Sequence, residues 1–426
     1  MKKIILLVLV LQLTAFSALS AIQNKNTWDY LLFIFDRYEI NGSQDFYQFE
    51  SDLRKDNDVV DEFNNQSETG IISYLLFEDN KIVIDESDIP DFDHDGVKIE
   101  RYLPSHSMGK SLVSYITGHA ICEGYIESVD ERLTGWDVIQ NTLYEDQVLI
   151  NLLNMSAGDQ EYIGERLDPQ VDNQWKATGK NLNMTSLETI MNSYMQNTNK
   201  GRDVYNYSAL TTHVIFNYVL HKSGDDILDK VFTDHVKVKN NVYFTKTQKG
   251  IGQSARYSFY ADRYDYLRIA KTIMNDWHSD TCIGDYLRTV YDRRIVKADD
   301  IKYPVSVGLY TQKYGGQFHF DIYGFKRGRK IIGIDGFAGQ QILIDLDNKK
   351  IIVVNSMYRN YDWKKIVFDK LSPSNIQSSN GSQCPDGSEL KKTVSDDGSY
   401  YVYKCSSRSE ERRVGKECRS RWSPYH

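Results

Sequence analysis

Residues 103–120 read LPSHSMGKSLVSYITGHA and combine a helical pattern with a candidate nucleophile. Their apolar residues recur at the spacing of one helix face, which predicts a buried helix: Met108, Leu112, Ile116 and Ala120. Ser107 and Lys110 stand at the start of this helix, three residues apart, so the lysine amine can reach the serine hydroxyl. Such a serine is a candidate nucleophile, and a helix N-terminus favours a developing oxyanion. The alternative is a capping serine followed by a solvated lysine.

The sequence contains none of the common motifs of other catalytic mechanisms. There is no G-x-S-x-G, H-E-x-x-H, G-x-x-x-x-G-K or Cys-x-x-Cys motif, and none of the nine histidines stands at ligand spacing from another. The acidic run at 91–96 resembles a calcium loop, but its twelfth position is Tyr102 rather than a bidentate glutamate. A second Ser-x-x-Lys, Ser388 to Lys391, lies in a polar stretch without a helix and is interpreted as chance. The sequence therefore predicts no cofactor and no metal.

Strand patterns flank a long helical middle. Residues 71–77 and 81–84 surround Glu78-Asp79-Asn80, which indicates a β-hairpin. Helical periodicity then continues to Trp277, and strand patterns return at 303–311, 317–323, 330–334, 341–346 and 351–358. We expect an α+β fold, in which an antiparallel sheet built from both chain ends is flanked by helices and carries an inserted helical lobe.

Composition limits the possible partners. The 426 residues carry 51 Lys and Arg against 59 Asp and Glu, a net charge of −8, which argues against a nucleic-acid binder. Apolar residues make up 41%, with 30 tyrosines and only seven prolines, so we expect a large folded core.

The two chain ends look foreign to that core. Residues 1–21 combine Lys2-Lys3, a short apolar run and small residues, which is typical of a secretory signal peptide. The apolar run is shorter than the ~20 residues that span a bilayer, so we expect no stable membrane span and a periplasmic or secreted protein; an uncleaved anchor is the alternative. Residues 408–426, RSEERRVGKECRSRWSPYH, resemble a translated sequencing adapter, with a genuine basic tail as the alternative.

If that tail is foreign, the natural chain has four cysteines rather than five, because Cys418 lies in the tail. Cys384 and Cys405 bracket a segment that could form a small hairpin closed by a disulfide. Cys122 and Cys282 are either buried free thiols or a second pair. We expect five regions: a signal peptide at 1–21, an N-terminal segment at 22–69, the main domain at 70–371, a linker and Cys-closed segment at 372–407, and the tail at 408–426.

Further segments carry a resemblance. VLINLLNMSAG at 148–158, VYNYSA at 204–209 and GIDGFAGQ at 333–340 follow the Ser-x-x-Lys segment in order. Together, over about 300 residues, they resemble the serine β-lactamase-related family, which includes class C β-lactamases, penicillin-binding carboxypeptidases, esterases and amide-dimer hydrolases. The resemblance implies a β-lactamase/transpeptidase-like fold.

The resemblance also implies roles. Ser107 would be the acylated nucleophile, and Lys110 and Tyr207 would share proton transfer, with the formal base left open. The backbone N–H groups of Ser107 and Phe337 would form the oxyanion hole, with Gly336 in the family's third motif.

Two positions of the substrate pocket depart from the family. Ala209 stands where the family has an asparagine, and Ile334-Asp335-Gly336 replaces Lys-Thr-Gly or His-x-Gly. The cation that would hold a substrate carboxylate is thereby lost, although Lys326, Arg327 or Arg329 could supply one if not solvated. We therefore expect an esterase or amidase acting on a small ester, amide or peptide that is neutral or cationic. The alternatives are a β-lactamase or D-alanyl carboxypeptidase, and an inactive binding protein of the same fold.

Overall fold

The structure of the protein is a computed structural model. It describes residues 36–89, 102–160, 162, 185–247, 252–297, 311–322, 329–357 and 360–371, and the backbone of four short strands at 93–94, 97–98, 389–394 and 401–406. The predicted signal peptide, the predicted adapter-derived tail and Cys384 lie outside the described residues.

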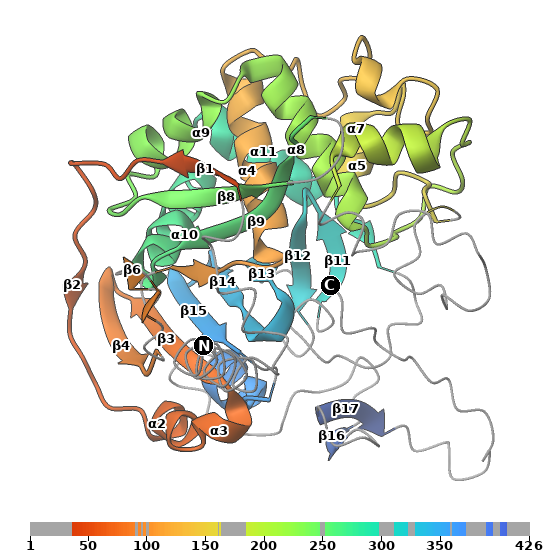
Figure 1. Ribbon diagram of the computed structural model, residues 1–426. Coiled ribbons are helices and arrows are strands. Elements are labelled where there is room, and N and C mark those ends of the chain that lie inside the picture. The colour runs from red at the N-terminus through yellow and green to blue at the C-terminus, as the bar shows by residue number, and fades with distance from the viewer. Residues whose placement is uncertain are drawn as a thin grey trace, which may run out of the picture.

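A nine-stranded sheet joins the two ends of the main domain. Its order is β10 (Ile295–Val296), β11 (Thr311–Gly315), β12 (Phe318–Ile322), β13 (Ile331–Asp335), β14 (Gln341–Asp345), β15 (Lys350–Ser356), β3 (Ile71–Glu78), β4 (Lys81–Ser87) and β2 (Glu50–Ser51). Neighbours are antiparallel except for the parallel β2–β4 pair. In Figure 1 the orange strands β3 and β4 lie beside the blue strand β15, which confirms a sheet built from both chain ends.

The predicted hairpin is also confirmed. Glu78 of β3 pairs with Lys81 of β4. The two residues between them, Asp79 and Asn80, have φ of 51° and 61°. Two consecutive residues with positive φ form the tight turn that matches the twist of antiparallel strands, and Asp and Asn tolerate this conformation.

Side chains alternate along each strand, so the sheet presents apolar side chains on both faces, and helices pack against each of them. On β15, Ile351 and Val353 pack into the main core, with α10 (Arg263–Trp277) and α4 (Met108–Cys122). Ile352 and Val354 face a second core, with α2 (Asn57–Asn64), η8 (Lys364–Phe368) and α13 (Asp369–Leu371). The result is a helix–sheet–helix arrangement, which confirms the predicted α+β class.

The inserted helical lobe surrounds α4, which is buried along almost its whole length. Around it lie α5 (Leu149–Leu153), α8 (Ala209–Ser223), α9 (Ile227–Asp229), η6 (Lys230–His235) and α11 (Cys282–Asp292). A four-stranded sheet, β1 (Arg37–Ile40), β8 (Val242–Lys246), β9 (Ala255–Ala261) and β7 (Leu103–Pro104), ends on the residues just before Ser107. This sheet therefore fixes where α4 begins.

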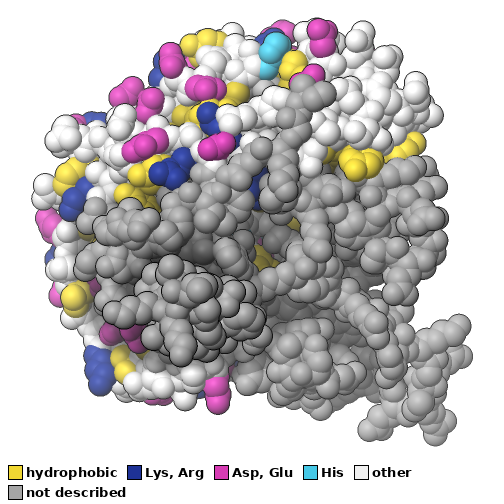
Figure 2. All heavy atoms as spheres, viewed as in Figure 1, with side chains coloured by type: hydrophobic (Ala, Val, Ile, Leu, Met, Phe, Trp, Pro, Cys, Tyr) yellow, Lys and Arg dark blue, Asp and Glu magenta, His cyan; other side chains and the backbone are white. Residues whose placement is uncertain are grey.

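Short elements complete the described chain. They are α3 (Gln66–Thr69), η4 (Asp137–Ile139), α7 (Leu187–Ile190), η5 (Met191–Met195), η7 (Phe337–Gly339), and the strand pairs β5 (Asp93–His94) with β6 (Val97–Lys98) and β16 (Glu389–Val394) with β17 (Tyr401–Ser406). Among the described residues, no helix has both the length and the apolar character to cross a membrane. On the face shown in Figure 2, acidic and basic side chains are interspersed among the described residues.

One cysteine question is answered. Cys122, at the end of α4, and Cys282, at the start of α11, form a disulfide that spans 160 residues of chain. This is the second-pair alternative. The predicted Cys384–Cys405 bond lies outside what the structure describes, although β16 and β17 do form an antiparallel pair.

Candidate active site

Ser107 and Lys110 meet at the start of α4. Lys110 Nζ donates to Ser107 Oγ over 3.2 Å. Ser107 precedes the first helical residue but its side chain makes no capping hydrogen bond to the helix. Lys110 is only 1% exposed. The capping serine with a solvated lysine is therefore not the observed arrangement.

The backbone before Ser107 is held against β9. Ser105 N donates to the Phe259 carbonyl over 2.7 Å, and Ser105 Oγ accepts from Phe259 N over 2.9 Å. A Cβ on Gly109 would lie 1.8 Å from the Tyr257 carbonyl oxygen. Only glycine allows α4 to approach β9 this closely, and the approach brings the Tyr257 ring to Lys110.

Two aromatic faces enclose the lysine. Lys110 Nζ lies 4.5 Å from the centroid of the Tyr207 ring and 4.1 Å from that of Tyr257. Aromatic faces attract an ammonium group, and the attraction is stronger where water is excluded. Three residues that the sequence analysis selected, Ser107, Lys110 and Tyr207, therefore share one site, and Tyr257 is an addition that no motif indicated.

The segment carrying Tyr207 is anchored on both sides. Asn206 N donates to the Met155 carbonyl over 2.7 Å, and Asn206 Nδ2 donates to Asp159 over 3.0 Å. On the other side, Ser208 Oγ caps α8 by accepting from Thr211 N. Asp159 is buried, and burial raises the pKa of its carboxyl. Met155, within the segment 148–158 that carries the resemblance, and Asp159 just after it thus hold the tyrosine in place.

Ala209 is the first residue of α8 and is buried next to this cap. Its methyl group offers no hydrogen bond, so the polar contact that an asparagine would give a substrate here is absent from this side chain.

The third motif lies against the nucleophile segment. A Cβ on Gly336 would come within 2.4 Å of the Ser105 carbonyl oxygen, so the residue that follows β13 packs directly against the backbone of Ser105. The rings of His106 and Phe337 are in edge contact, with centroids 5.7 Å apart. The backbone segments of Ser107 and Phe337 are thus neighbours, as an oxyanion hole formed by both requires.

The two other residues of the motif face different ways. Ile334 is fully buried in the main core, so it packs on the face of β13 opposite to that of Asp335. Asp335 is 9% exposed and accepts a hydrogen bond from Gln341 Nε2 over 3.2 Å.

The motif contains no cation, but the buried Lys297 lies near it in the fold. Lys297 follows β10, and its Nζ donates to Thr311 Oγ1 over 2.5 Å and lies 2.9 Å from His319 Nδ1. Burial lowers the pKa of Lys297 to about 7, and the Asp335 charge opposes that shift. Lys297 and Asp335 therefore interact electrostatically, and no sequence motif predicted this interaction.

His319 links this lysine to the rest of the site. It pairs with Gly333 on β13, so its side chain is on the same face of the sheet as that of Asp335, two residues further on. Burial lowers the pKa of His319 well below its usual value, with further contributions from Lys297 and Lys110. The imidazole is therefore neutral at pH 7, with Nδ1 able to accept from Lys297.

Of the basic residues considered from sequence, Arg329 pairs with Asp345 and the Leu371 carbonyl. Lys326 and Arg327 lie outside the described residues. Among the described residues, Lys297, which follows β10, is a basic residue whose charge interacts with that of Asp335.

No protein-family model matches the chain, and no curated protein matches its sequence. Solved structures resemble it in fold. A Bacillus anthracis protein described as a 6-aminohexanoate-dimer hydrolase superposes with a TM-score of 0.54 at 15% identity, covering 80% of this chain and 92% of its own. A D-stereospecific amidohydrolase from Streptomyces sp. gives 0.51 at 10% identity, covering 75% and 99%. The chain therefore has the β-lactamase/transpeptidase-like fold, as the resemblance implied.

Proposed function

We propose that this protein is a serine hydrolase of the esterase or amidase type, which forms an acyl-enzyme on Ser107. The observation that carries the proposal is the buried Lys110 amine, within hydrogen-bond distance of Ser107 Oγ and against the Tyr207 ring. A nucleophile and a proton acceptor in direct contact, at a helix N-terminus, form the minimal unit for acyl transfer. Hydrolases with the same fold support the reaction class.

Each step has a group to perform it. The Lys110–Tyr207 pair accepts the Ser107 proton as Oγ attacks the substrate carbonyl carbon. The backbone N–H groups of Ser107 and Phe337 stabilise the resulting oxyanion. The tetrahedral intermediate then expels an alcohol or amine, which takes up the proton, and a water molecule attacks the ester to release the acid and restore Ser107.

One observation favours a second candidate. Lys297 interacts electrostatically with Asp335, next to the position where the family that the sequence resembles holds a substrate carboxylate, and this weakens the sequence-based argument against an anionic substrate. A β-lactamase or D-alanyl carboxypeptidase activity is therefore the second candidate, and turnover of a chromogenic cephalosporin separates it from hydrolysis of neutral esters.

We further propose that the protein is exported after removal of residues 1–21. The Cys122–Cys282 disulfide supports an oxidising compartment, such as the periplasm or the exterior.

A fluorophosphonate probe, which reacts with activated serines, tests the assignment. Intact-mass measurement should find one adduct per chain, and peptide mapping should place it on Ser107. The Ser107→Ala chain should not be labelled, whereas Ser388→Ala, a change in the second Ser-x-x-Lys, should label normally. An unlabelled native chain that also turns over no ester would instead identify an inactive binding protein. Labelling that persists in Ser107→Ala contradicts the proposal.

A further inference from the structure

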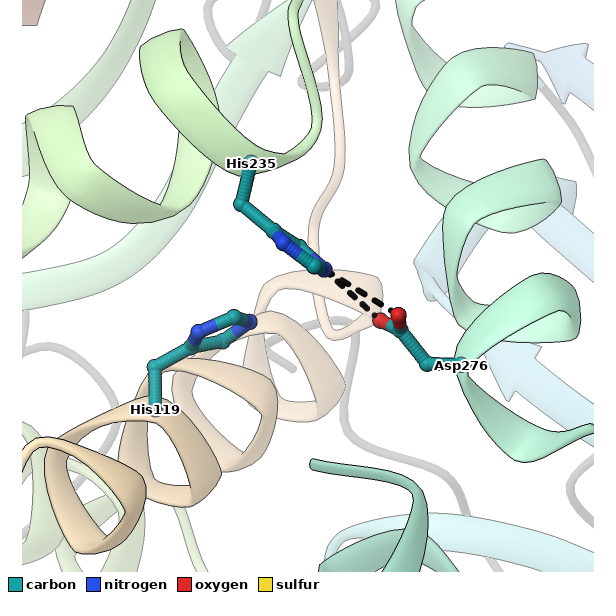
Figure 3. A group of neighbouring side chains, drawn as sticks. All are labelled: His119, His235 and Asp276. Carbon is teal, nitrogen blue, oxygen red and sulfur yellow. Dashed lines mark hydrogen bonds and ion pairs between the residues drawn. The ribbon is translucent and has the colours of Figure 1, made fainter. Parts of the chain in front are cut away.

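The far end of α4 carries a second group of polar side chains. His119 on α4, His235 at the end of η6 and Asp276 in the last turn of α10 converge from three elements (Figure 3). One potential ligand atom from each lies within 4.8 Å of the others. These residues take no part in the proposed acyl transfer, because His119 lies twelve residues after Ser107, or about 18 Å along the helix.

Part of the cluster is an ordinary contact. His235 Nε2 lies 3.1 and 3.0 Å from the two Asp276 carboxylate oxygens. The His235 side chain is about one-third exposed, while Asp276 is nearly buried. A histidine–aspartate pair explains these two residues but not why a third polar ring is packed beside them.

His119 is the unexplained member. Its ring centroid lies 4.7 Å from that of His235. Its Nε2 is buried and, among the described residues, has no hydrogen-bond partner. A buried ring nitrogen without a partner costs free energy, which a bound ligand would recover.

The surroundings hold the three side chains in place. Tyr115, one turn before His119 on α4, donates a hydrogen bond to Asp276 Oδ2. The Cys122–Cys282 disulfide ties the end of α4 to the segment that follows Asp276. Hydrogen bonds behind the ligands and a fixed backbone are what metal sites use to orient their donor atoms.

We propose that His119, His235 and Asp276 bind a zinc ion, with a water molecule in the fourth position. Two imidazoles and a carboxylate are a ligand set that suits zinc. Donor atoms around a tetrahedral zinc ion lie about 3.3 Å apart, so the present arrangement has to contract by roughly 1.5 Å. The ion acts as a clasp between α4, η6 and α10.

The test is a zinc titration of the full chain, made without a histidine tag, stripped with EDTA and kept oxidised. Native mass spectrometry should find one zinc ion per chain, and zinc should raise the melting temperature by several degrees. Cobalt(II) in its place should give the intense visible absorption of a tetrahedral site. His235→Ala, a change at an exposed position that leaves the core intact, should weaken zinc binding by at least about tenfold. His119→Gln should do the same.

The matched control is His221→Ala. His221 stacks on Trp136 near the end of α8, away from the cluster, so this variant should bind zinc as the native chain does. Three results overturn the proposal: no zinc uptake by the native chain, uptake of copper or nickel but not zinc, or undiminished zinc uptake by His235→Ala. If His119→Gln does not fold, the exposed His235→Ala variant decides.

Discussion

The two ends of α4 are built in opposite ways. At the N-terminal end, Ser107 and Lys110 are three residues apart, and one helical turn is enough to bring them into contact. At the C-terminal end, His119 meets His235 and Asp276 only because η6 and α10 pack beside it. The first site is local and is therefore visible as a motif. The second exists only in the folded chain.

The environments of the two ends differ as well. Lys110 is enclosed by two tyrosine rings, whereas His119 adjoins another imidazole and a carboxylate. A buried lysine amine beside a serine hydroxyl suits proton transfer, and imidazoles beside a carboxylate suit a divalent cation. Since about 18 Å of helix separates the two ends, changes at one should be separable from changes at the other.

The largest expected effect is at the N-terminal end. Lys110→Met removes the proton acceptor from Ser107 while keeping an apolar stem of similar length. We expect kcat/KM for an ester substrate to fall about 10³-fold, within the range for loss of a general base. Lys222→Met is the control, because Lys222 pairs with Glu131 on the surface of the helical lobe, and its activity should match that of the native chain. Activity retained by Lys110→Met would remove Lys110 from the mechanism.

A smaller effect is expected at the opposite end, where the disulfide closes a loop of 160 residues. Replacing Cys122 and Cys282 by serine together should lower the free energy of unfolding by about 2–5 kcal/mol, measured by denaturant unfolding. Zinc affinity should fall as well, because α4 is no longer tied to the segment after Asp276. Fluorophosphonate labelling of Ser107 at 25 °C should remain. Loss of labelling in a chain that is still folded would show that the two ends of α4 are coupled.

The same contrast explains how far the sequence could predict the structure. The hairpin at Asp79-Asn80 and the buried α4 follow from periodicity and turn residues within a short window, and both are confirmed. The sheet that joins β3 to β15 was expected from the order of strand and helix patterns along the whole chain, and it is confirmed too. For the Cys122–Cys282 pair, sequence left two alternatives open, since a span of 160 residues is decided by packing alone.

No local sequence pattern indicated the remaining site residues. Lys297 is a lysine in an ordinary polar stretch, and it reaches His319 only because β10 pairs with β11. His235 and Asp276 are 41 residues apart, far beyond any metal-binding motif. The loss of the motif cation, with Ile334 in its place and Asp335 beside it, was visible from sequence. The interaction of Asp335 with Lys297 was not, because Lys297 lies 38 residues earlier in the chain.

The smallest expected effect concerns Lys297, and it is tested by the pH dependence of kcat/KM. Lys297 has a pKa of about 7, lowered mainly by burial, so its amine is charged below pH 7 and neutral above it. If the ammonium helps to hold a substrate carboxylate beside Thr311 and His319, kcat/KM for a carboxylate-bearing ester should fall as the pH rises through 7. The measured quantity is the ratio of kcat/KM for this ester to that for its neutral analogue, because titration of Lys110 or Tyr207 affects both substrates alike. In Lys297→Met the ratio should be about tenfold lower at pH 6 and unchanged at pH 8.5. A ratio that is independent of pH in the native chain would mean that Lys297 does not hold the substrate carboxylate and acts only on Asp335.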